Sequence, residues 1–217
     1  MESNALKEAK AALRRCREEY EAILATNTFN GQPAHTLAGG GVDSSQGVIA
    51  FDAHKVAKSW SDFLIYANRI YEKLSAGANT SKTRAWAGRM IFQRRKDPLL
   101  IYLHQARNSD EHGFDGIVKL VPSSITNLTG APLEMQELIG PADARGYQFT
   151  LPPGGIVSIK PAHAEIVEVH DRRHGDSFPP PTSHLGKPLA NHDVSHVAGL
   201  SLAFLEGMVL DAQQRFG

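Results

Sequence analysis

The stretch that decides the fold reads DPLLIYLHQARNSDEHG, from Asp97 to Gly113, and it marks both ends of a helix. Asp97 suits the N-cap because its carboxylate can accept a hydrogen bond from a backbone N–H of the first turn. Pro98 suits the first helical position, and Gly113 is typical of the residue just beyond a helix. We therefore expect a helix that runs to about His112. Its predicted buried side consists of Leu99, Leu100, Tyr102, Leu103 and Ala106.

Four other segments repeat apolar residues every three or four positions, which indicates amphipathic helices. They cover residues 4–25, 52–75, 81–94 and 193–215. Asp52 is the expected N-cap of the second helix. The last segment is so apolar that it must pack on other helices, and we expect it to return to the N-terminal bundle.

The character of the sequence changes after Gly113, where apolar and polar residues begin to alternate as they do in strands. We expect strands at residues 117–121, 147–151, 156–160 and 164–170, with the middle two forming a hairpin across Pro152–Gly155. Residues 26–50 contain three consecutive glycines and are expected to form a flexible connector, and residues 172–188 are expected to be irregular.

These segments predict an α+β protein, mainly a helical bundle of about five helices. A small antiparallel β region is inserted before the C-terminal helix. The expected organisation is a helical bundle over residues 1–113, a β-rich insertion or subdomain over 114–188, and a C-terminal helix over 189–217 that packs back on the bundle.

Composition restricts the class of protein. The 217 residues carry 23 basic and 23 acidic side chains, which argues against a uniformly basic nucleic-acid-binding domain. The single cysteine, Cys16, fits a reducing compartment and is expected to be a buried apolar residue of the first helix. The N-terminal residues do not resemble a signal peptide, and no uninterrupted apolar run reaches membrane-spanning length. We expect a cytoplasmic protein without a membrane partner.

Polar side chains gather at the C-terminal end of the helix that begins at Asp97. They are His104, Arg107, Asn108, Glu111 and His112. Spacings of three and four residues place the first four on neighbouring turns of one side. A histidine can move a proton near neutral pH, and a guanidinium binds phosphate oxygens with two N–H groups.

Arg107 and His112 form an Arg-x4-His pattern with asparagine directly after the arginine, and here the sequence resembles the HEPN superfamily of helical-bundle proteins. The resemblance covers the helical parts, residues 52–113 and 193–215. It implies a metal-independent endoribonuclease, related to toxin or defence proteins, that acts as a homodimer and cuts RNA with the help of its 2′-hydroxyl. It also implies that Arg107 binds the scissile phosphate and that His112 is the general acid and base, with His104, Asn108 and Glu111 in support.

The spacing also allows a structural reading of the same residues. Five positions separate Arg107 from His112 by about 140° around a regular helix, so they meet only if the helix end unwinds or a second subunit contributes. In the structural alternative, Arg107 pairs with Glu111 and His112 caps the last carbonyls. A third reading keeps the bundle as a non-catalytic module that binds RNA, a nucleotide or a protein partner.

Residues 82–96 are the most basic part of the chain, and they could follow an RNA backbone or be only a solvated helix face. The RNA-binding candidates there are Arg84, Arg89, Arg94 and Arg95. The β region is a candidate surface for a protein partner.

The remaining histidines suggest little chemistry. His192 and His196 are four residues apart, as in zinc proteases, but an aspartate replaces the expected glutamate, and a metalloprotein is the weaker alternative. The spacings of four further histidines fit no metal pattern, and we interpret them as ordinary loop or strand residues: His163, His170, His174 and His184. We therefore expect neither a metal nor a cofactor.

Overall fold

The computed structural model describes residues 3–26, 29–30, 47–111, 116–121, 124–127, 134–139, 145–150, 157–160, 162–171 and 174–216. Within these residues the helices are α1 (Asn4–Thr26), α2 (Ala53–Ala76), α3 (Ser81–Arg94), α4 (Pro98–Glu111) and α5 (Val194–Phe216). Each predicted helix is confirmed to within one or two residues. The predicted fold class, α+β and mainly helical with small antiparallel strand pairs before the last helix, is also confirmed.

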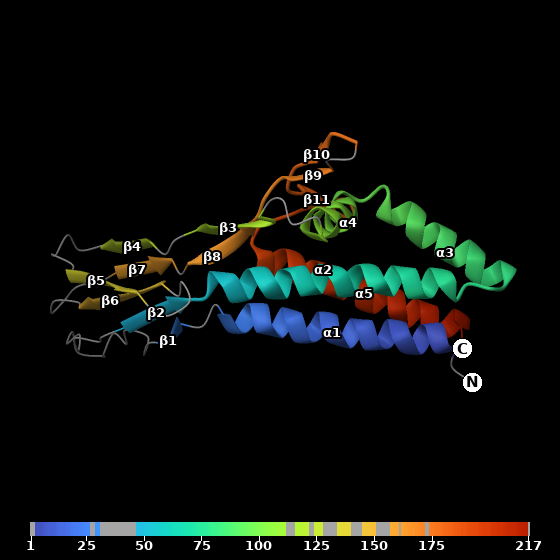
Figure 1. Ribbon diagram of the computed structural model, residues 1–217, viewed down its shortest axis with the longest axis horizontal. Helices are drawn as coiled ribbons and strands as arrows, with labels where there is room; N and C mark the ends of the chain where they lie inside the picture. Colours follow the sequence, from blue (N-terminus) through green and yellow to red (C-terminus); the bar gives the residue numbers. More distant parts are fainter. Residues whose placement is uncertain are drawn as a thin grey trace.

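Three long helices form the body of the molecule. Figure 1 shows α1, α2 and α5 running side by side, with both chain ends at one end of the bundle and the strands towards the other. Their shared core contains fully buried side chains such as Trp60, Phe63 and Leu205. Cys16 is buried there too, as predicted, and burial raises the pKa of its thiol to about 12.

Local signals set the ends of α2. The Asp52 side chain accepts a hydrogen bond from the Lys55 N–H at 2.9 Å, as expected of an N-cap. Gly77 closes the helix where α1 passes closest, since a Cβ there would lie 2.2 Å from the Cβ of Ala5. A glycine is therefore needed at this position for close helix packing.

The last helix carries the longest apolar face. In the described part of the chain, α5 alone has the length and composition of a helix that could cross a membrane. A core helix of a folded domain has the same properties, and α5 packs on α1 and α2. The absence of a membrane partner therefore stays a prediction.

The short helices lie on one side of this body. α3 is attached through Trp86, whose indole N–H donates to Asp211 of α5 at 2.6 Å and whose ring meets Phe216 edge-on. α4 packs against α2 and also against two short strands, β9 (Val169–Asp171) and β11 (Ser183–His184). It therefore links the bundle to the segment that precedes α5.

The strands make several small antiparallel sheets. Their bounds are β1 (Phe29–Asn30), β2 (Gly47–Phe51), β3 (Val118–Val121), β4 (Ser124–Asn127), β5 (Glu134–Ile139), β6 (Arg145–Thr150), β7 (Val157–Lys160), β8 (His163–Ile166), β9 (Val169–Asp171), β10 (Asp176–Phe178), β11 (Ser183–His184) and β12 (Lys187–Pro188). One sheet has the order β1-β2-β6-β5, and the other pairs are β3-β8, β4-β7, β9-β10 and β11-β12.

Several strand predictions are wrong. The two strands expected as a hairpin do not pair, because β6 lies between β2 and β5 while β7 pairs with β4. The segment expected to be a connector contributes β1 and β2, although the three glycines themselves lie outside the described residues. The strand expected at 164–170 is divided into β8 and β9, and residues 172–188 contain β10, β11 and β12. Three of the pairings, β2-β6, β3-β8 and β4-β7, join distant parts of the chain, which alternation alone does not reveal.

Candidate functional site

Helix α4 positions the predicted site, and its first turn is fixed as the sequence indicates. The Asp97 carboxylate accepts a hydrogen bond from the Leu100 N–H at 3.1 Å, and Pro98 is the first helical residue. The predicted apolar side is buried: Leu99, Leu100, Tyr102, Leu103 and Ala106. Tyr102 also donates its hydroxyl hydrogen to the Val167 carbonyl at 2.7 Å, which joins α4 to the strand region.

The polar residues of α4 lie along its other side and are only partly exposed. His104, Arg107 and Asn108 are half-buried, and the Arg107 guanidinium donates to the amide oxygen of Asn108 at 3.3 Å. Asp110 accepts a hydrogen bond from Ser61, which holds the last turn of α4 against α2. The side chain of Glu111 and the whole of His112 lie outside the described residues, so the approach of Arg107 to His112 stays a prediction.

His104 lies in an environment that disfavours its charged form. Burial lowers the pKa of His104, and the positive charges of Arg94 and Arg107 lower it further, while Glu72 acts in the opposite direction. Its Nδ1 is buried and has no hydrogen-bond partner among the described residues. Excess positive charge around an imidazole favours the binding of an anion at that place.

Arg94 reaches this place from α3. Its guanidinium lies over the Tyr71 ring at 4.8 Å from the centroid and donates to the Asn68 side chain at 3.3 Å. Burial lowers the pKa of Arg94. A small cavity of about 20 Å³ lies between these side chains and His104, enough space for a single water molecule.

The other predicted RNA-binding arginines are more exposed than Arg94. Arg84 and Arg89 are exposed on α3 and Arg95 is its exposed C-cap, and Arg84 donates to the Asn79 carbonyl at 3.0 Å. The structure thus divides the basic stretch into one arginine turned towards α4 and three turned to solvent.

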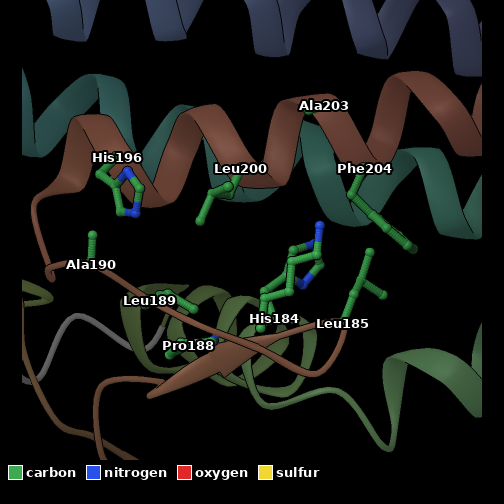
Figure 2. Close-up of a pocket in the computed structure, with 10 residues that line it drawn as sticks. His184, Leu185, Pro188, Leu189, Ala190, His196, Leu200, Ala203 and Phe204 are labelled. Carbon is green, nitrogen blue, oxygen red and sulfur yellow. The ribbon is translucent and has the colours of Figure 1, made fainter.

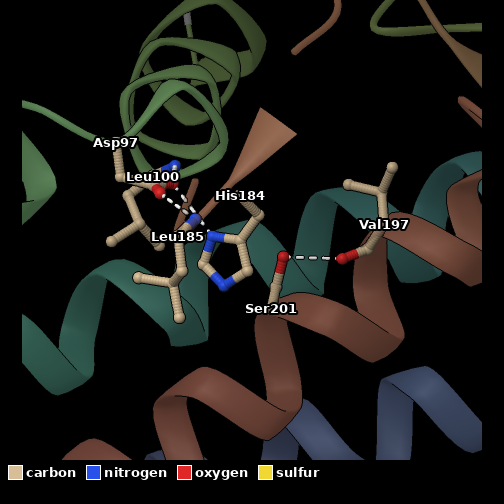
Figure 3. Close-up of polar contacts among 6 residues, drawn as sticks. All are labelled: Asp97, Leu100, His184, Leu185, Val197 and Ser201. Carbon is tan, nitrogen blue, oxygen red and sulfur yellow. Dashed lines mark hydrogen bonds and ion pairs between the residues drawn. The ribbon is translucent and has the colours of Figure 1, made fainter. Parts of the chain in front are cut away.

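Sequence reasoning missed a second polar site at the beginning of α4. The Asp97 carboxylate also accepts hydrogen bonds from His184 Nδ1 at 2.9 Å and from the Leu185 N–H at 2.6 Å (Figure 3). Asp97 and His184 are both buried, so the interpretation of His184 as an ordinary loop residue is wrong. The two residues are 87 positions apart in the sequence, and no local signal relates them.

These contacts settle the state of the Asp97 carboxyl. Burial on its own would raise the pKa of Asp97, but the hydrogen bonds from His184, Leu185 and Leu100 outweigh it and leave the pKa below its ordinary value. An ionised carboxylate only accepts hydrogen bonds, so Nδ1 of His184 carries the hydrogen and Nε2 faces away from Asp97 (Figure 3).

Ser201 lies near this pair but does not complete a catalytic triad. Its hydroxyl is fully buried and donates to the Val197 carbonyl at 2.6 Å, one turn earlier in α5 (Figure 3). A hydroxyl committed to the helix backbone is not activated by an imidazole.

His184 lines a cavity of about 440 Å³ between α5 and residues 184–190. Figure 2 shows His196, Leu200 and Phe204 of α5 on one side, and His184, Leu185 and Leu189 on the other. The cavity is mostly apolar, and its two histidines, His184 and His196, lie on opposite sides of it.

The two histidines of the proposed zinc pattern are used separately. His192 precedes α5 and its Nε2 lies 3.1 Å from the Pro181 carbonyl, whereas His196 is in α5 and lines the cavity. No group of three or more side chains able to hold a metal ion occurs in the parts of the chain that are described.

We compared the chain with known proteins. No family model, curated protein or solved structure matches it. Only the side chains described above therefore bear on the function of the protein.

Proposed function

We propose that the protein is a HEPN-like, metal-independent endoribonuclease whose active site lies at the C-terminal end of α4. One observation carries the proposal: burial, together with the positive charges of Arg94 from α3 and Arg107 from α4, lowers the pKa of His104. A scissile phosphate would supply the missing negative charge.

Each side chain has a defined task in this mechanism. Arg107 binds two phosphate oxygens and stabilises the charge that develops on them, with Asn108 orienting the guanidinium through the hydrogen bond described above. His112 removes the proton of the RNA 2′-hydroxyl as that oxygen attacks the phosphorus. His112, which now carries this proton, then donates it to the 5′-oxygen of the leaving group.

The proposal includes a homodimer, because one regular helix separates Arg107 and His112 by about 140°. A two-fold axis beside the end of α4 would bring the arginine of one copy to the histidine of the other. The same surface could alternatively hold RNA without cutting it, and the experiment below separates the two outcomes.

The test is cleavage of a defined single-stranded RNA by the full chain, with and without EDTA. We expect cleavage that survives EDTA and leaves 2′,3′-cyclic phosphate ends. Arg107→Ala and His112→Ala should each reduce the rate by at least about 100-fold, because each removes a group that acts on the transition state.

Matched controls distinguish the site from a general loss of charge. Arg14→Ala removes an exposed arginine of α1, and His54→Ala removes an exposed histidine of α2; both variants should cut RNA like the wild-type protein. Loss of cleavage with EDTA, or full activity of His112→Ala, would contradict the mechanism. Binding of the RNA without any cleavage would favour the non-catalytic alternative.

A further inference from the structure

The cavity beside His184 has the dimensions of a small-molecule site. Its volume of about 440 Å³ lies within the roughly 300–1,000 Å³ typical of such sites. The residues that line it are His184, Leu185, Lys187, Pro188, Leu189, Ala190, His196, Leu200, Ala203 and Phe204. They come from α5 and from the segment directly before it (Figure 2).

Most of the wall is hydrocarbon. Leu200 and Phe204 face the cavity from α5, and Leu185 and Leu189 face it from the opposite side (Figure 2). Leu185 is 52% exposed, which is unusual for a leucine next to a buried polar pair. An apolar ligand would remove this surface from water and gain free energy by doing so.

His184 is fixed in place as a polar group of a binding site must be. It is only 8% exposed, its Nδ1 is bound to Asp97, and its ring meets Phe204 edge-on at 5.6 Å between centroids. His184 lines the cavity, and its Nε2, on the ring edge away from Asp97, has no hydrogen-bond partner among the described residues. A nitrogen on a ring that is held rigidly at the wall of a cavity can orient a ligand.

The charges around the cavity select the sign of the ligand. Its ionisable lining residues are His184, Lys187 and His196, which carry positive charge or none, and no lining residue is acidic. The Asp97 carboxylate, which lies behind His184, already accepts three hydrogen bonds. Such a site favours an anion over a neutral or cationic molecule.

We propose that this cavity binds a small apolar molecule that carries one carboxylate. The hydrocarbon part lies against Leu189, Leu200 and Phe204, and the carboxylate accepts a hydrogen bond from Nε2 of His184. In this complex both ring nitrogens of His184 carry a hydrogen, so the imidazolium and Lys187 balance the two carboxylates, of the ligand and of Asp97.

The first experiment measures binding of three eight-carbon probes to the full chain by calorimetry. Octanoate should bind at least about tenfold more tightly than octan-1-ol or octylammonium, because only octanoate makes a charge-assisted hydrogen bond. Equal binding of octanoate and octan-1-ol would show an apolar cavity without the proposed polar contact. Tighter binding of octylammonium, or no binding of any probe, would overturn the proposal.

Three variants test whether the probe binds in the cavity. Ala203→Trp fills it from an exposed position of α5 and should abolish octanoate binding, whereas Leu210→Trp, at an exposed position of α5 outside the lining, should leave it unchanged. Lys187→Glu should weaken octanoate but not octan-1-ol. Unchanged octanoate affinity in Ala203→Trp would contradict the site.

The decisive readout needs no variant. In protein labelled with ¹⁵N-histidine, octanoate should shift the Nε2 signal of His184, and both ring nitrogens should be protonated in the complex. A His184 signal that does not respond to bound octanoate would overturn the proposed contact. None of these measurements depends on RNA cleavage, so the cavity and the ribonuclease proposal can fail separately.

Discussion

The beginning and the middle of α4 are built in opposite ways. At the beginning of the helix, the buried Asp97 carboxylate accepts three hydrogen bonds and faces an imidazole that complements it. Further along, the imidazole of His104 is half-buried, its Nδ1 has no hydrogen-bond partner among the described residues, and two arginines oppose its protonation. The first arrangement stabilises the fold, and the second one costs stability, as sites that bind or transform ligands often do.

Replacing Asp97 should have the largest effect on stability. Asp97→Ala leaves His184 and two backbone N–H groups without an acceptor and should lower the free energy of unfolding by about 3–5 kcal/mol. Asp97→Asn keeps one acceptor oxygen and should lose less. Urea denaturation measures both variants.

The matched control for this loss is Asp52, the exposed N-cap of α2. Its side chain accepts one backbone hydrogen bond, so Asp52→Ala should cost only about 1 kcal/mol. Equal losses for Asp97→Ala and Asp52→Ala would show that the contact with His184 adds nothing beyond helix capping.

The loss of stability at acidic pH should depend on the same carboxylate, that of Asp97. The pKa of Asp97 is lower in the folded protein than its ordinary value of 3.8, so the unfolded chain binds the proton more tightly. The stabilisation by Asp97 is therefore fully present above about pH 3.8, and it is lost as the pH falls through the pKa of Asp97 in the folded protein. Unfolding by urea at a series of acidic pH values should show the wild type and Asp97→Asn converging; parallel curves would contradict this.

His104 should give a weaker effect at a different pH. Its pKa in the folded protein is below the ordinary value of 6.5, so the unfolded chain binds the proton more tightly here too. Stability should fall as the pH decreases from about 6.5 to the folded pKa. His104→Leu should abolish this slope and change stability at higher pH by no more than about 1 kcal/mol. A variant that keeps the slope would place its origin in another group.

The exposed arginines of α3 should give the smallest effect. Arg89→Gln should leave the free energy of unfolding within about 0.5 kcal/mol of the wild type. If α3 contacts RNA, the variant should also reduce the slope of RNA affinity against salt concentration, by the amount expected for the loss of about one phosphate contact. An unchanged salt dependence in the Arg84, Arg89 and Arg95 variants would show that this helix face is only solvated.

The sequence predicts those parts of the fold that depend on neighbouring residues. Helix bounds follow from periodicity and from caps such as Asp52 and Asp97, which act within one turn. Strand pairing is different, because β2 finds its partner β6 about a hundred positions later and residues 29–51 lack a strong strand pattern.

The candidate sites follow the same rule. His104, Arg107 and Asn108 could be found because they lie on one helix at spacings of three and four residues. Arg94 was predicted only as part of a basic stretch, and its place beside His104 follows from how α3 meets α4. His184 could not be assigned, because its burial and its tautomer depend on Asp97, which the sequence indicates only as a helix cap.

The most direct test of the central claim is complementation between two inactive proteins. Arg107→Ala and His112→Ala should each fail to cut RNA alone, but a mixture allowed to exchange subunits should recover about a quarter of the wild-type rate in EDTA. Half of the dimers are then mixed, and each mixed dimer has one intact site formed by the arginine of one copy and the histidine of the other. A mixture as inactive as its components, while the wild type cuts RNA, would contradict a site shared between two copies of α4.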